Sequence, residues 1–182
     1  MTLSLVQGDS RSPLPAVIDW PTVQLAQFRH DETYHREISR LTVQERLTHM
    51  ALHFAKYAGR LLAPHDENTF KQTAVDTMVI AVSCANILNL AIGQQSLLKV
   101  SLPGGRDDFS RELAISAGKM AAACEKLDHL EDYPFRSAVS AETVRLINLT
   151  LSIFAVEGWQ PTQEMATRLD TVKKKSIFYG QA

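Results

Sequence analysis

Two acidic residues begin two similar apolar stretches of the sequence, and both are candidates for chemistry. "DTMVIAVSCANILNLAIG" starts at Asp76 and "ETVRLINLTLSIFAVEG" starts at Glu142; in each, an acid and a threonine precede a mostly apolar run that stops at a glycine. A carboxylate buried between helices needs a partner, because an unpaired charge is costly in a low-dielectric interior. That partner is either a metal ion, which would allow metal-dependent catalysis, or a basic side chain.

Basic side chains stand in the helical stretch that precedes each acid. "KYAGRL" supplies Lys56 and Arg60, and "ISAGKM" supplies Lys119. We expect Lys56 or Arg60 to face Asp76, and Lys119 to face Glu142, as ion pairs that join neighbouring helices. Two other interpretations stay open: the acids stabilise the positive end of a helix dipole, or they are remnants of a catalytic site.

A stripe of potential metal ligands lies upstream of these cations. Glu45, His49 and His53 are spaced at i, i+4 and i+8, which places them on one face of a helix. Two imidazoles and a carboxylate are suitable ligands for zinc. Lys56 follows one turn later on nearly the same face, so we favour a solvated or hydrogen-bonded stripe and assign no metal site.

Two further charged segments are candidate surfaces. "CEKLDHLED" gathers Glu125, Asp128, His129, Glu131 and Asp132, an acidic helix end that we expect to be exposed. "RLDTVKKKSIFYG" places Lys173, Lys174 and Lys175 before Ile177 and Phe178. We expect a helix C-terminus whose cations favour the dipole and whose apolar residues dock on the protein, with Lys173 and Lys175 as further candidates for binding phosphate.

Helical periodicity accounts for most of the chain. It predicts helices over about 21–39, 43–62, 69–91, 108–130 and 138–157, and a last one from Thr162. Thr42 and Glu45 form a capping box at the start of the second. The breaks "APHDEN", "SLPGGRDD" and "EDYPFR" contain proline, and no segment alternates with period two long enough for a strand. Cys84 and Cys124 fall within apolar helical patterns and are expected to be free and buried. The fold class is all-α.

The helices form a repeated order. Helix 43–62, a break and helix 69–92 match helix 108–130, a break and helix 138–157. A helical hairpin cannot cover its own apolar face, so the two should pack as a four-helix bundle with pseudo-two-fold symmetry. We divide the chain into an irregular N-terminal arm (1–21), a first helical half (22–100) and a second half with the C-terminal helix (106–182).

This order of helices resembles the MazG-like, all-α NTP pyrophosphatase superfamily. The resemblance covers residues 43–180, mainly in helix pattern and loop placement. It implies an EExxE pattern on the first helix of a hairpin and an ExxD on the second. Those acids would hold Mg²⁺, which activates water to release a nucleoside monophosphate and pyrophosphate from a triphosphate.

The sequence departs from that motif in both halves. "KYAGRL" places Lys56, Tyr57 and Arg60 at the acidic positions, and "TAVD" retains only Asp76, with Thr73 in place of the glutamate. "ISAGKM" places Ile115, Ser116 and Lys119 at those positions, and "VSAE" retains only Glu142. One acid in each half cannot assemble the magnesium site, and the new cations would repel a divalent ion.

The expected function is therefore that of a divergent family member without the metal site and without a cofactor. It would bind a nucleotide or another phosphate through Lys56, Arg60, Lys119 and residues 173–175, or act as an interaction module. The alternative is an active nucleoside triphosphate pyrophosphohydrolase that uses Mg²⁺ at a rearranged site made of Asp76 and the acids between Glu125 and Asp132.

Charge and hydropathy narrow the classes of partner. The formal net charge of −1 gives no argument for binding nucleic acid or an anionic membrane. We find no uncharged apolar run of the roughly 18–20 residues that a bilayer span needs. "MTLSLVQGDSRSPLP" lacks the basic start and apolar core of a signal peptide. We expect a cytoplasmic protein, and a homo-oligomer stays open.

Overall fold

The computed structural model describes residues 18–95, 97, 99–102 and 104–180, and these residues form helices and no strand. The all-α prediction is confirmed. The helices are α1 (Trp20–Tyr34), α2 (Arg36–Ser39), α3 (Val43–Leu62), α4 (Glu67–Ile87), a 3₁₀ turn (Ile92–Gln94), α5 (Arg106–Asp128), α6 (Phe135–Glu157) and α7 (Pro161–Lys173).

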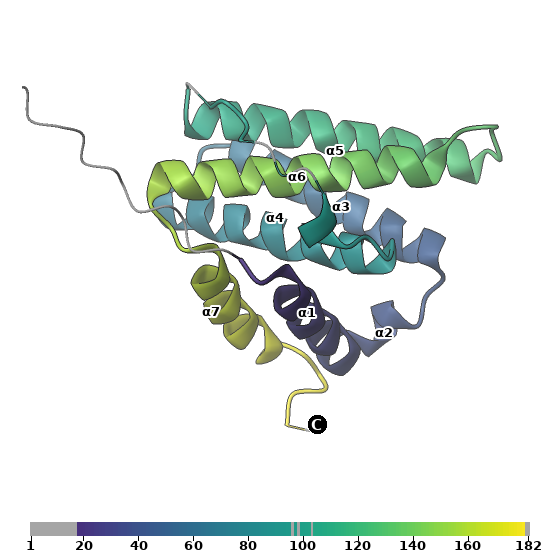
Figure 1. Cartoon of the computed structure of the whole chain (residues 1–182), viewed down its shortest axis with the longest axis horizontal. Coiled ribbons are helices and arrows are strands. Elements are labelled where there is room, and N and C mark those ends of the chain that lie inside the picture. The colour runs from purple at the N-terminus through teal and green to yellow at the C-terminus, as the bar shows by residue number, and fades with distance from the viewer. Residues whose placement is uncertain (1–17, 96, 98, 103, 181–182) are drawn as a thin grey trace, which may run out of the picture.

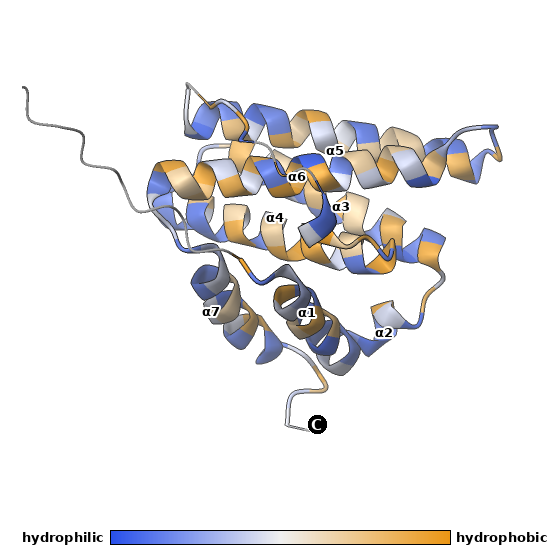
Figure 2. Ribbon diagram, viewed as in Figure 1, coloured by the Kyte–Doolittle hydropathy of each residue, from blue (hydrophilic) through white to orange (hydrophobic). Residues whose placement is uncertain are grey.

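The four longest helices share one hydrophobic core. Both α3 and α6 pack against α4 and α5, and the four run alongside one another in Figure 1. Each contributes a fully buried phenylalanine: Phe54, Phe70, Phe109 and Phe154. The rings of Phe70 and Phe109 meet edge to face with centroids 5.7 Å apart. Apolar residues recur along all four helices in Figure 2, as burial of one face of each requires.

Side-chain capping explains where α3 and α4 begin. Thr42 and Glu45 form the predicted capping box of α3, with the Thr42 amide donating to Glu45 Oε2 at 2.9 Å. α4 begins at Glu67, two residues before the predicted start, because Asp66 Oδ1 accepts from the Thr69 amide at 2.7 Å. α5 and α6 also begin two and three residues earlier than predicted, at Arg106 and Phe135, but neither has a side-chain cap.

The predicted helix 21–39 is wrong in its continuity. The chain breaks at His35, where φ is −131°, so that α1 and α2 are separate helices. α1 also begins at Trp20, inside the predicted arm 1–21, because Asp19 caps it and Pro21 suits a first turn. Residues 1–17 of that arm lie outside the described residues.

Helices α1 and α7 cover a second side of α4. Both pack against α4 and against each other, on the side of the bundle shown at the bottom of Figure 1. α4 therefore has neighbours on nearly every side, which explains why polar residues such as Thr73, Asp76 and Ser83 are buried along it. This arrangement places Asp76, a charged residue of α4, under α7.

Within the described part of the chain, α6 is long and apolar enough to cross a membrane by length and composition. Half of its most apolar 18-residue window is buried inside the structure. A central helix of a bundle has the same composition, because it is apolar on several faces.

Both cysteines are free, as predicted, and Cys84 and Cys124 are 0% and 6% exposed. Burial raises the pKa of each thiol, which lowers the fraction of reactive thiolate. We predict that Ellman's reagent labels neither thiol rapidly at pH 8 in the native protein, whereas guanidinium chloride exposes both. Rapid labelling of native Cys84 would show that α4 does not pack as described.

Candidate functional site

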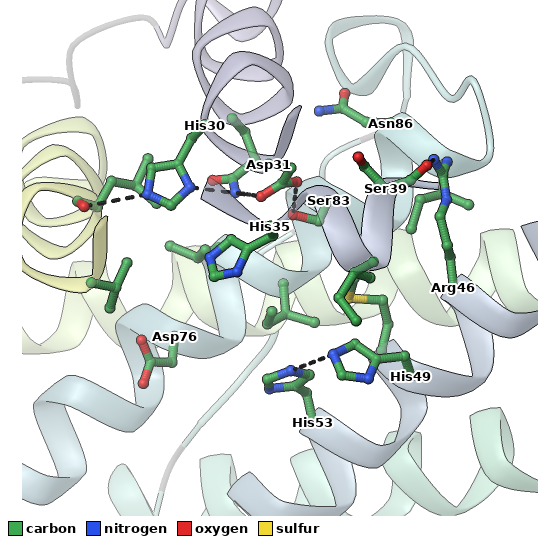
Figure 3. A pocket seen from close by; sticks show the side chains of 18 of the residues that line it. His30, Asp31, His35, Ser39, Arg46, His49, His53, Asp76, Ser83 and Asn86 are labelled. Atoms are coloured by element: carbon green, nitrogen blue, oxygen red, sulfur yellow. Dashed lines mark hydrogen bonds and ion pairs between the residues drawn. The ribbon is translucent and has the colours of Figure 1, made fainter. Parts of the chain in front are cut away.

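A cavity of about 330 Å³ lies among α1, α2, α3, α4 and α7. α4 contributes Asp76, Val79, Ile80 and Ser83 to its lining, and α3 contributes residues from Arg46 to Arg60. These positions recur every three or four residues, as expected of one helix face. Figure 3 shows the polar side chains that converge on the cavity from different helices.

A buried ion pair closes one end of the cavity. Arg168 of α7 donates from Nε and Nη2 to the two carboxylate oxygens of Asp76, at 2.6 and 2.9 Å. The two side chains are only 17% and 10% exposed, so the pair is largely shielded from water. The prediction that Lys56 or Arg60 is the ion-pair partner of Asp76 is wrong, because α7 places a guanidinium over this carboxylate.

Lys56 and Arg60 nevertheless line the same end of the cavity. Arg60 Nη1 donates to Thr73 Oγ1 at 3.4 Å, and Lys56 Nζ lies 3.2 Å from His53 Nδ1. Burial and the nearby Arg60 lower the pKa of Lys56. With Arg168, this end holds three cations against the single carboxylate of Asp76, an excess of two positive charges.

His49 and His53 form a closely packed pair on α3. Their Nε2 atoms are 3.1 Å apart, and His53 Nδ1 lies 3.2 Å from the Tyr57 hydroxyl. Burial and the neighbouring Lys56 lower the pKa of His53 to about 4, and the same causes lower that of His49. At neutral pH both rings are therefore uncharged in this structure, and one Nε2 donates to the other.

The metal site hypothesised from Glu45, His49 and His53 is not assembled. Glu45 folds back on Thr42 in the capping box, away from the two imidazoles. In the described ranges, no group of three or more His, Cys, Asp or Glu side chains is arranged to hold a metal ion.

The opposite end of the cavity carries hydrogen-bond acceptors. Asp31 of α1 accepts from Gln27 Nε2 at 2.8 Å and from Ser83 Oγ at 2.7 Å. His30 packs beside it, with Nδ1 3.8 Å from Asp31 and Nε2 3.3 Å from the Leu169 carbonyl oxygen. Three buried atoms of cavity-lining residues have no hydrogen-bond partner among the described residues: the acceptor Gln27 Oε1, the ring nitrogen His30 Nδ1, and Nε of Arg46, which is a donor.

The acid of the second half, Glu142, lies outside the cavity. Lys119 pairs with Glu142 at 3.2 Å, as predicted, but its side chain is 57% exposed. Arg145 joins this pair, 3.8 Å from Glu142, and also bonds Glu112 and, at 2.9 Å, Ser116 Oγ. Lys119 does not line the cavity, whereas Lys56 and Arg60, with which it was grouped as a phosphate ligand, do.

The C-terminal lysines are divided between two roles. Lys173 and Lys174 pair with Asp170 at 2.5 and 3.2 Å, whereas Lys175 lines the cavity. Phe178 docks under the guanidinium of Arg36, 5.2 Å from the ring centroid, whereas Ile177 is 79% exposed. The predicted apolar docking is wrong for Ile177, and Phe178 contacts the cation of Arg36 and is not one of the residues packed against the hydrophobic core.

The acidic end of α5 is not part of the cavity lining. Asp128 accepts from Gln44 at 2.8 Å, and Glu131 pairs with Lys126 at 2.7 Å. Of the acids in the rearranged site that the alternative function requires, Asp76 alone borders the cavity. The structure does not bring Asp76 together with the acids between Glu125 and Asp132.

Sequence reasoning missed the residues of α1 and α7 in this site. The one available signal was "RHDETYH", a polar segment with two histidines and two acids, in which His30, Asp31, Glu32 and His35 all border the cavity. Arg168 carried no signal, because nothing in the sequence pairs it with a residue 92 positions away.

In comparisons with known proteins, no family model, curated protein or solved structure matches this chain. The family resemblance therefore rests on the helix order and the aligned motifs described above.

The ion pair of Asp76 makes a prediction for stability. Arg168→Met should lower the free energy of unfolding by about 3–5 kcal/mol, because it leaves a buried carboxylate without a partner. Asp76→Asn in the same chain should recover part of that loss. Lys119→Met, which breaks a half-exposed pair, should cost about 0–1 kcal/mol. Urea denaturation measures the free energy of unfolding of each variant. Equal losses in Arg168→Met and Lys119→Met would contradict the prediction.

His53 makes a prediction for pH dependence. The unfolded imidazole gains its proton near pH 6.5, but the folded one does so only near pH 4. The unfolded state thus binds more protons between these values, so the free energy of unfolding should fall as pH is lowered from 6.5 to 4. His53→Gln should weaken this dependence in urea titrations, and His129→Gln, at the exposed end of α5, serves as the control. Equal slopes for wild type and His53→Gln would contradict the prediction.

Proposed function

We propose that this protein binds a small phosphate-bearing ligand, such as a nucleotide, in the cavity between α1, α3, α4 and α7. The observation that carries the proposal is the excess of cations at one end, where Lys56, Arg60 and Arg168 surround the single carboxylate of Asp76. Three cations and one acid leave two positive charges, which match a phosphate monoester dianion.

The donors at this end suit phosphate in geometry as well as charge. Guanidinium groups bind phosphate oxygens through several N–H donors at once, and an ammonium group binds them as a point charge. Arg168 uses Nε and Nη2 for Asp76, which leaves Nη1 for a ligand. Placing an anion beside Lys56 would also relieve the repulsion from Arg60 that lowers its pKa.

In the α3–α4 hairpin, His53 and Val79 leave the cavity open. Aligning "KYAGRL" with "ISAGKM" and "TAVD" with "VSAE" matches His53 with Glu112 and Val79 with Arg145. In the second half the long Arg145 side chain crosses to Glu112 and Ser116. Val79 is too short to do the same toward His53, and both residues line the cavity instead.

We further propose that the fold is a four-helix bundle of two tandem MazG-like hairpins that has lost the magnesium site. The α3–α4 and α5–α6 hairpins, their shared core and their equivalent acids, Asp76 and Glu142, support this. Magnesium requires several hard oxygen ligands, whereas Lys56, Tyr57 and Arg60 stand at the family's acidic positions and Asp76 is engaged by Arg168. The expected activity is therefore binding without hydrolysis.

A matched pair of variants tests the proposed function. Arg60 and Lys119 stand at equivalent positions of the two hairpins, but Arg60 alone borders the cavity. We expect adenosine and cytidine 5′-monophosphates to bind with measurable heat in calorimetry, without added metal. Arg60→Met should weaken that binding roughly 10-fold or more, as loss of a charge-assisted hydrogen bond does. Lys119→Met should change the affinity less than about twofold, because that charge lies outside the cavity.

Hydrolysis assays complete this test. Nucleoside triphosphates incubated with the protein and Mg²⁺ should release no pyrophosphate. Release that disappears in Asp76→Asn would establish the active enzyme instead. Equal weakening by Arg60→Met and Lys119→Met would place the ligand elsewhere.

A further inference from the structure

We propose that the cavity recognises both ends of its ligand, with phosphate at Lys56, Arg60 and Arg168 and an amino-bearing head group at Gln27 and Asp31. This inference rests on the proposed function and adds to it the chemical class of the ligand. It is carried by buried acceptors at the α1 end of the cavity, which a phosphate ion alone could not satisfy.

Gln27 is the first of these acceptors. Its side chain is 1% exposed and borders the cavity, and its Oε1 has no hydrogen-bond partner within the described residues. The amide orientation is fixed, because Nε2 donates to Asp31 Oδ1 at 2.8 Å and a flip would bring two acceptors together. A buried acceptor without a partner is costly, so this oxygen would gain from a donor. Because the oxygen is buried from solvent in this structure, a ligand must displace the side chains that cover it.

Asp31 is the second acceptor. Its carboxylate receives one bond from Gln27 and one from Ser83 Oγ, and the side chain remains 27% exposed. A carboxylate has about four acceptor sites, so Asp31 retains capacity for a donor that enters the cavity. Gln27 and Asp31 are joined by their 2.8 Å hydrogen bond, so their free acceptor positions lie close together and suit the two N–H bonds of an amino group.

The spacing of the two ends follows from α4. Asp76 marks the cationic end and Ser83 marks the acceptor end, and they are separated by two helical turns, about 10 Å along the axis. Val79 and Ile80 line the cavity between them. In Figure 3, Asp31 and Ser83 lie together and Asp76 lies apart from them. The ligand must therefore extend across an apolar middle section, with its phosphate and its amino group at opposite ends.

Matched nucleotide analogues test the head group. Adenosine 5′-monophosphate differs from purine riboside 5′-monophosphate, and cytidine 5′-monophosphate from its 4-deamino analogue, by the exocyclic amine alone. In calorimetry of the full chain, at least one amino compound should bind about tenfold or more tightly than its partner, because a charge-assisted hydrogen bond is lost without the amine.

Variants assign the effect to the acceptors. Asp31→Asn and Gln27→Met should each reduce the difference within the preferred pair to less than about threefold, while inorganic phosphate binds as before. Glu37→Gln removes an exposed carboxylate of α2 outside the cavity lining and should leave the difference unchanged. Thermal melts of each variant identify loss of folding, and the Gln27→Met result stands if Asp31→Asn is unstable.

The outcomes separate this inference from the proposed function. If nucleotides bind and Arg60→Met weakens them, but neither matched pair differs, the phosphate site stands and the head-group proposal is overturned. A difference that persists in both Asp31→Asn and Gln27→Met also overturns it. If neither nucleotides nor inorganic phosphate bind, the proposed function itself is wrong.

Discussion

The bidentate ion pair between Asp76 and Arg168 determines how the rest of the molecule is arranged. A carboxylate in the middle of α4 would be unfavourable beneath a layer of helices unless a cation came with that layer. Arg168 supplies it and thereby fixes α7 against α4, with α1 packed beside it. The cavity lies between this outer pair of helices, α3 and the face of α4 that carries Asp76.

Asp76 and Glu142, the acids that begin the two similar apolar stretches of the sequence, are neutralised in different ways. Glu142 finds its cations on α5 and α6, inside its own hairpin, and Arg145 occupies the space beside it. Asp76 depends on a helix outside its hairpin, so the space beside α3 stays open and is bordered by cations. Arg145 fills the space within the α5–α6 hairpin, whereas Val79, its counterpart in the repeat proposed above, lines the cavity.

Local sequence rules predicted most of the helices, but they did not predict which residues of distant helices form ion pairs. The capping box at Thr42, the apolar faces of α3 to α6 and the Lys119–Glu142 pair follow from spacing within one hairpin. Arg168 could not be paired with Asp76 this way, because periodicity gives the face of a helix and not the helix that covers it. The break at His35 was also missed, because the segment contains no proline or glycine to mark it. The residues that α1 and α7 contribute to the site depend on such long-range packing.

The separation of Asp76 and Arg168 along the chain has a consequence for biosynthesis. They are 92 residues apart, and Arg168 belongs to the last helix. On the ribosome, Asp76 emerges long before its counterion, when α4 has only α1, α2 and α3 to pack against. A nascent chain can leave that carboxylate facing water until α7 is synthesised. Premature termination before residue 168 would thus release a chain whose central helix carries an uncompensated charge, a defect that quality-control proteases could detect.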